Sequence, residues 1–179
     1  LPIWILMVQG LVNSFGTIVM AAFSAAVKID SFAYMPVQDF GNAFSTFVAQ
    51  NYGAGKKERI REGIRDAVLL VLIFCLVISA GVCIFAKPLL LLFVKPQETE
   101  ILAVGMNYLR IEGSFYCLIG FLFLFYGFYR AVKMPGMSVI LTVASLGSRV
   151  ALAYVLSAVP QIGVTGIWAA VPIGWLLAD

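Results

Sequence analysis

The 179-residue sequence contains no histidine, and this absence removes several kinds of functional site. Without an imidazole, neither a Ser-His-Asp triad nor a histidine-ligated metal centre can be built. The three cysteines, Cys75, Cys83 and Cys117, lie in apolar runs without CxxC spacing, so we interpret them as buried free thiols. No cluster of His, Cys or acidic residues stands at the edge of an apolar run. We therefore expect no catalytic residue, no metal site, no cofactor and no enzymatic activity.

Charge is also scarce. Charged residues make up 12% of the chain and apolar residues 62%, against roughly 25% and 45–50% in an ordinary globular protein. A soluble fold of this length cannot bury so many apolar side chains and still cover its surface with polar ones. The net charge of +3 is too small to indicate a nucleic-acid partner. The composition instead indicates the lipid bilayer as the surrounding solvent.

Long uncharged runs predict an all-α, polytopic membrane helix bundle. The clearest run is Ala67–Ala86, which has 20 residues without a charge and, as a helix, would extend about 30 Å, the thickness of the hydrocarbon core. We expect four complete and two partial spans. The predicted helices cover residues 1–13, 18–50, 61–94, 100–130, 136–159 and 164–179. The chain opens in an apolar run without Met or a basic segment, so we recognise no signal peptide and interpret both ends as cuts through a longer protein.

The distribution of basic residues predicts the orientation of these spans. Five of the twelve Lys/Arg residues lie between Lys56 and Arg65, and two spans later Arg130 and Lys133 form another short basic connection. We expect both connections to be cytoplasmic. The connections at 87–100 and 160–164 have no excess of positive charge, so they are expected on the outer side.

The stretch QNYGAGKKERIREGIRD, residues 50–66, has glycines followed by a lysine. It is not a Walker phosphate loop, because the spacing differs from GxxxxGK[ST] and no Ser or Thr follows Lys56 to hold magnesium. We interpret it as a polar connection in which Gly53 and Gly55 turn the backbone. The residues from Glu58 to Asp66 then form an amphipathic lead-in to the next span.

This stretch also resembles the QN-x-GAGK-x-x-R signature of the multidrug and toxic compound extrusion (MATE) transporters. Other segments resemble MATE helices in the same order. They are FGTIVMAAFSAAVKIDSFAYMP, YGFYRAVKMP, SLGSRVALAYVLS and GVTGIWAAVPIGWLLAD. The resemblance covers nearly the whole chain and implies the C-terminal six-helix lobe of a twelve-helix transporter, from late in the seventh helix into the twelfth.

The resemblance implies a secondary antiporter in the inner (plasma) membrane. Such a protein exports organic, often cationic, drugs or toxins in exchange for protons or sodium ions by alternating access. Its partners would be lipid, small organic substrates and an N-terminal lobe of the same chain. Sodium-coupled relatives carry an acidic residue at mid-depth of the fourth helix, where residues 118–120 here have none. The alternatives are a flippase of the same superfamily for lipid-linked oligosaccharides and, in another class, a non-transporting structural subunit.

Charges within the predicted spans are candidates for the ion or substrate pathway. We expect Asp30 and Arg149 to face the interior of the lobe and pair, and Lys28 to meet Asp39, a backbone carbonyl or the outer headgroups. The alternative is that these charges only stabilise the lobe. Glu112 is expected to pair near the interface beside Arg110, or else to face the cavity.

Uncharged polar side chains complete the candidate pathway. Gln38 and Asn42 are interpreted as cavity-lining groups, although hydrogen bonds between helices explain them equally well. Tyr34 and Tyr116 are candidates for stacking on an organic cation, with packing against neighbouring helices as the alternative.

Overall fold

A computed structural model of the chain describes residues 3–179, with side chains from residue 6 onward. The described part is an all-α bundle, as expected. Nine α-helices and one π-helical segment follow one another within it. Their bounds are α1 Ile3–Ser14, α2 Thr17–Gly53, α3 Lys57–Ile84, α4 Ala86–Leu90, α5 Thr99–Gly113, α6 Tyr116–Ala131, α7 Pro135–Thr142, the π-helical segment Val143–Gly147, α8 Ser148–Ser157 and α9 Val164–Ala178.

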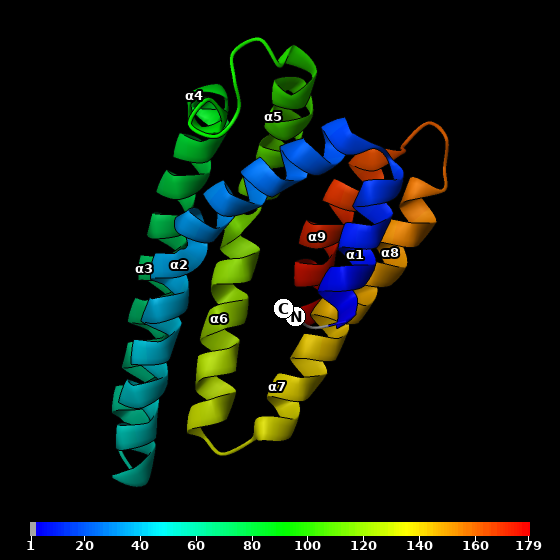
Figure 1. Cartoon of the computed structure of the whole chain (residues 1–179). Coiled ribbons are helices and arrows are strands. Elements are labelled where there is room, and N and C mark those ends of the chain that lie inside the picture. Colours follow the sequence, from blue (N-terminus) through cyan, green and yellow to red (C-terminus); the bar gives the residue numbers. More distant parts are fainter. Residues whose placement is uncertain (1–2) are drawn as a thin grey trace.

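The helices form two groups that α2 connects. Figure 1 shows α2 crossing the bundle obliquely, from beside α1 at one end to beside α3 at the other. In the first group, α2 packs on α3, α5 and α6. In the second group, α8 packs on α9 and on α1, and α7 leads into α8 through the π-helical segment. Contacts of α9 with α5 and α6 join the two groups.

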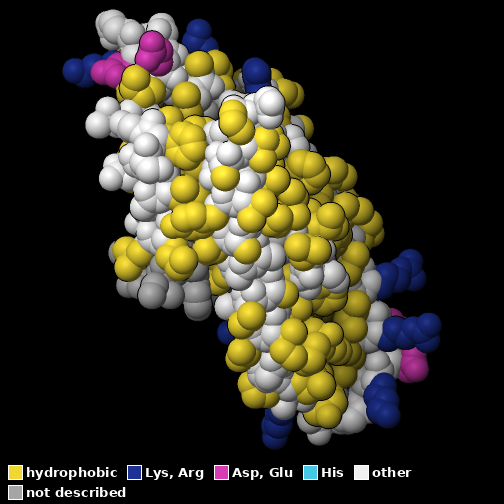
Figure 2. Space-filling model, turned by 90° about the vertical axis from the view of Figure 1, so that its right-hand side faces the viewer, with side chains coloured by type: hydrophobic (Ala, Val, Ile, Leu, Met, Phe, Trp, Pro, Cys, Tyr) yellow, Lys and Arg dark blue, Asp and Glu magenta, His cyan; other side chains and the backbone are white. Residues whose placement is uncertain are grey.

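The long helices match the expected membrane spans. The segments Thr17–Gly53, Lys57–Ile84 and Pro135–Ser157 are each long and apolar enough to cross a bilayer, and the bent pair α5–α6 is a fourth candidate. α9 is a shorter apolar helix. Large apolar side chains of α3 such as Leu70, Leu76 and Val77 are exposed. Figure 2 shows a wide band of hydrophobic side chains with charged side chains gathered toward its two ends, which is the pattern of a lipid-facing surface.

Two expected helices are broken. The helix predicted over 61–94 begins earlier, at Lys57, and ends at Ile84, and the short α4 follows it. Pro88 explains this break, because a proline ring clashes with the carbonyl four residues earlier and here that residue is Ile84. The helix predicted over 100–130 bends by 51° between α5 and α6. The bend follows Glu112 and Gly113 directly, so the acidic residue sits at the break.

The connections alternate between two ends of the bundle. The turns from α2 to α3 and from α6 to α7 lie at one end (bottom of Figure 1). We call it the basic end because it carries the basic stretches 56–65 and 130–133, which include the first residues of α3 and the last residues of α6. The turns from α1 to α2, α4 to α5 and α8 to α9 lie at the opposite end. Gly55 has φ +68° and turns the chain as predicted, whereas Gly53 is still the last residue of α2.

The core combines aromatic packing with close helix contacts. Trp168 of α9 stacks on Phe23 of α2, with ring centroids 5.6 Å apart, and meets the edge of Tyr108 of α5 at 4.8 Å. Helices α2 and α6 approach through glycine. A β-carbon on Gly127 would lie 2.5 Å from the carbonyl oxygen of Gly41. Small residues of this kind are what membrane helices use to bring their backbones together.

Candidate functional site

Five polar side chains meet inside the lobe, and we call them the buried polar cluster. Asp30 comes from α2, Tyr108 and Glu112 from α5, Tyr116 from the first residue of α6, and Arg149 from α8. Asp30 and Glu112 are each only 3% exposed. Five charged or hydroxyl-bearing groups from four helices therefore occupy a place where an apolar core would otherwise continue.

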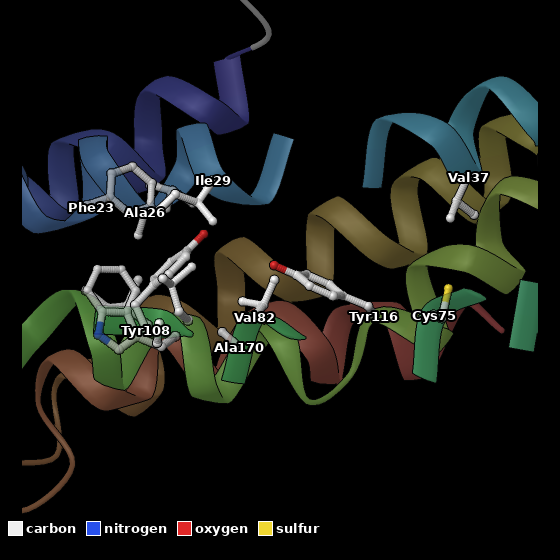
Figure 3. Close-up of a cluster of buried hydrophobic side chains, with 14 of the residues drawn as sticks. Phe23, Ala26, Ile29, Val37, Cys75, Val82, Tyr108, Tyr116 and Ala170 are labelled. Carbon is white, nitrogen blue, oxygen red and sulfur yellow. The ribbon is translucent and has the colours of Figure 1, made fainter. Parts of the chain in front are cut away.

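Local geometry explains how α5 and α6 bring their residues to this point. Tyr108 and Glu112 are four residues apart on α5, so they lie on one face of the helix. The bend after Glu112 then places Tyr116 at the start of α6. Figure 3 shows the hydroxyl groups of Tyr108 and Tyr116 pointing toward the same region of the core, beside Ile29 of α2.

The contacts within the cluster centre on Asp30. The Tyr116 hydroxyl donates a hydrogen bond to Asp30 Oδ1. The Glu112 carboxyl and the Tyr108 hydroxyl are direct neighbours of the Asp30 carboxyl, and Arg149 is close enough for its charge to act on both acids. Asp30 Oδ2, Glu112 Oε1 and Arg149 Nε are buried without a hydrogen-bond partner among residues 3–179 as described. The cluster is therefore only partly satisfied by the protein itself.

The charges of the cluster do not cancel. Two carboxylates and one guanidinium carry a net charge of −1 when all three are ionised. Isolated charge in an apolar interior is costly. A proton or a monovalent cation at the carboxyl pair would balance this charge, and neighbouring carboxyls are a common way to hold a single proton between two groups.

Some predicted site residues are in the cluster and others are not. Asp30 and Arg149 both face the interior at this site, but the predicted pair between them is not formed among the described residues. Asp30 accepts its hydrogen bond from Tyr116, and Arg149 Nε has no partner there. The expectation that Glu112 pairs near the interface is wrong, because its side chain is buried against Asp30. Its position follows from the bend, which periodicity alone does not reveal.

Lys28 turns away from Asp30. Its ammonium group lies 5.4 Å from the centre of the Phe93 ring, and its side chain lines a surface pocket with Lys95 and Glu98 at the opposite end of the bundle. The position agrees with the snorkelling alternative rather than with an interior pair. Asp39 is exposed on α2 and is not part of the cluster.

Other predicted polar residues lie at a separate place near the basic end. Gln38 and Asn42 line a pocket between α2, α6 and α7. Asn42 Oδ1 accepts a hydrogen bond of 2.9 Å from Arg130 Nη2. Tyr34 packs on Phe123, with ring centroids 6.1 Å apart, as the packing alternative expects. This second site contains no residue of the buried polar cluster.

Sequence reasoning missed Tyr108 and assigned Tyr116 a different role. The segment YLRIEGSFY places Tyr108, Glu112 and Tyr116 at intervals of four residues. This spacing puts aromatic hydroxyls on either side of an intramembrane acid, and it is the signal by which the cluster can be recognised. Arg130 was assigned only to a cytoplasmic connection, although its side chain also lines the pocket.

Comparison with known proteins identifies the family of this chain. The family model described as MatE matches residues 2–155. This chain belongs to the MatE family. It is 31% identical over 164 residues to the probable multidrug resistance protein YoeA of Bacillus subtilis, covering 90% of this chain and 35% of YoeA. It is 29% identical to an FAD transporter of Shewanella oneidensis, covering 88% of this chain and 34% of the relative.

Solved MATE structures share the fold. An outward-facing multidrug resistance MATE family transporter of the MOP superfamily superimposes with a TM-score of 0.89 at 21% identity, covering 98% of this chain and 40% of that one. The MATE transporter ClbM in complex with Rb+ gives 0.89 at 24% identity, covering 98% and 41%. The chain thus spans about 35–40% of the length of these proteins. Its family and its apolar helices make it part of a multi-pass membrane protein.

Proposed function

We propose that this chain is one lobe of a secondary antiporter that exports drugs or toxins across the inner (plasma) membrane. A second lobe of the same polypeptide would complete the transporter, and the two would alternate access to a shared cavity. Family membership and the names of the multidrug resistance relatives support this proposal. The basic end, with the connections 56–65 and 130–133, would face the cytoplasm, in line with the positive-inside rule.

The buried polar cluster is the observation that carries the proposal. With all three groups ionised, the cluster would carry a net charge of −1, which favours the uptake of a proton or a sodium ion. Release of that ion would restore the charge. Asp30 and Glu112 would hold the ion, Tyr116 would orient Asp30 through its hydrogen bond, and the positive charge of Arg149 would partly compensate the remaining carboxylate. An uncompensated charge in an apolar interior is costly. Binding or release of the ion would therefore favour different arrangements of the helices that meet at the cluster.

The test uses the complete transporter in proteoliposomes. A pH gradient and a sodium gradient are imposed separately, and export is followed with two fluorescent dyes, the cation ethidium and the anion fluorescein. One gradient should drive export of at least one dye. The gradient that drives export identifies the coupling ion. Export of ethidium rather than fluorescein would support the expected cationic substrate.

The variants Asp30→Asn and Glu112→Gln should abolish gradient-driven export while the exported dye still binds. Asp39→Asn is the matched control, because Asp39 lies on the same helix as Asp30 but is exposed. Export by Asp30→Asn at the rate of Asp39→Asn, with both proteins folded, would remove the cluster from the coupling mechanism. Failure of both gradients to drive any export would refute the antiporter proposal itself.

A further inference from the structure

A pocket of about 540 Å³ lies between α2, α6 and α7 near the basic end, apart from the buried polar cluster. Its volume is within the range of sites for small organic ligands. The lining combines polar and aromatic side chains from both helix groups. The polar and aromatic lining residues include Gln38, Asn42, Phe123, Tyr126, Arg130 and Thr142.

Among the residues that the structure describes, Arg130 is the only charged one in this lining. Its guanidinium donates to Asn42 Oδ1 over 2.9 Å, which fixes the side chain against α2. A guanidinium carries five N–H donors in a planar fork, so donors remain for a ligand after this bond is made. A fork of this kind matches a carboxylate or a phosphate. The pocket therefore has a positive group in place and no acid to attract a cation.

The aromatic side chains define the rest of the ligand. Phe123, Tyr126 and Arg130 are separated by three and four residues on α6, so they lie along one face of that helix. The Tyr126 hydroxyl lies 3.3 Å from Thr142 Oγ1 of α7, within hydrogen-bond distance, and this contact holds the ring at the wall of the pocket. Two rings in line with a guanidinium suit a ligand that has an aromatic body and an anionic group at one end.

We propose that this pocket binds an aromatic organic anion, with Arg130 contacting its carboxylate or phosphate and with Phe123 and Tyr126 beside its rings. The inference rests on the proposed transport function. It names the class of substrate that would bind in the pocket near the basic end. It differs from the cationic cargo expected from the resemblance. Binding is measured at equilibrium without a gradient, so its outcome is independent of whether the transporter is an antiporter.

The test compares two dyes built on one ring system, the anion fluorescein and the cation rhodamine 123. Each is titrated by fluorescence anisotropy into the purified complete transporter, and gel filtration and thermal unfolding check that each variant is folded. We expect tighter binding of fluorescein. Arg130→Gln should weaken fluorescein binding about tenfold or more, which is the usual effect of losing a hydrogen bond to a charged group, and should leave rhodamine 123 unchanged.

Lys133→Gln is the matched control, because it removes one positive charge from the same connection without touching the pocket. Arg130→Lys keeps the charge but loses the fork, so it should bind fluorescein with intermediate affinity, and it replaces Arg130→Gln if that variant does not fold. The proposal would be overturned if Arg130→Gln and Lys133→Gln lost the same affinity for fluorescein, or if Arg130→Gln lost none. Tighter binding of rhodamine 123 than of fluorescein would also overturn it.

A phospholipid headgroup shares the anionic chemistry, and nanodiscs separate it from a soluble ligand. Fluorescein binding should have the same affinity in nanodiscs of phosphatidylcholine alone and in nanodiscs that also contain phosphatidylglycerol, at an ionic strength that screens the surface charge. Loss of dye binding only in the presence of phosphatidylglycerol would assign the pocket to lipid and overturn the proposal for a small organic anion.

Discussion

Replacing Gly127 with alanine should push α2 and α6 apart. The added β-carbon would lie 2.5 Å from the Gly41 carbonyl oxygen and 3.5 Å from the Ser45 β-carbon. The close partner is backbone, so it cannot rotate away as a side chain would. Ordinary contact begins near 3.4 Å. The two helices must therefore separate by about 1 Å at this crossing, a distance at which a packed contact loses up to about half of its dispersion energy.

The expected cost in stability follows from this displacement. Overpacking a tight interface by one methyl group costs about 1–3 kcal/mol, and α2 packs on both α5 and α6. We expect a steric cost of about 2 kcal/mol for Gly127→Ala, because a rigid backbone atom faces the new methyl group. Alanine also stabilises a helix by about 1 kcal/mol relative to glycine. The observed loss of stability is therefore the steric cost minus this gain.

Gly81→Ala is the matched control for this substitution. Gly81 lies inside α3, and a β-carbon there would meet nothing within 4 Å, so only the helix propensity of alanine acts. Denaturation of the purified transporter in detergent, followed by tryptophan fluorescence, should show Gly81→Ala as stable as the unmodified protein or more so. Gly127→Ala should be clearly less stable. Equal stability of the two variants would refute the close approach of α2 and α6.

Three further substitutions test other parts of the lobe by the same unfolding measurement. Trp168→Ala should cost about 3–5 kcal/mol, because it empties a buried aromatic site; a loss below 1 kcal/mol would contradict that packing. Gly16→Ala should cost about 1–3 kcal/mol, because φ is +102° there, whereas Gly10→Ala in α1, with no atom in the way, should cost nothing. Tyr116→Phe should cost about 1–3 kcal/mol, because it leaves the Asp30 carboxyl without its hydrogen bond; unchanged stability would argue against that bond.

The fold was largely predictable because hydrophobic runs directly determine which segments enter the bilayer. The run Ala67–Ala86 identifies most of α3, and the charges after Gly55 identify the turn before it. The breaks were not predicted because each depends on backbone geometry that hydropathy does not record. Pro88 ends a helix four residues upstream, and the bend at Gly113 interrupts a run that hydropathy treats as continuous.

The site was predictable in part, for a related reason. An intramembrane charge is unusual in any sequence, so Asp30, Glu112 and Arg149 stand out without a structure. Their partners do not stand out, because a tyrosine in a membrane helix is common and its hydroxyl has a role only when another helix brings an acceptor to it. Tyr116 lies 86 residues from Asp30 along the chain. Only the bend between α5 and α6 makes the two meet.

The two sites connect the same two groups of helices at different depths. The buried polar cluster joins Asp30 of α2 to the neighbourhood of Arg149 of α8, while the pocket joins α2 and α6 to α7 near the basic end. α7 and α8 are continuous through the π-helical segment, and Gly174 of α9 packs so closely that a β-carbon there would lie 2.7 Å from the Ser145 carbonyl oxygen. A change of charge at Asp30 and Glu112 therefore acts on a helix that also forms one wall of the pocket. If both proposals hold, the affinity of the pocket for an anion should differ between wild type and Asp30→Asn, although residue 30 is not in its lining.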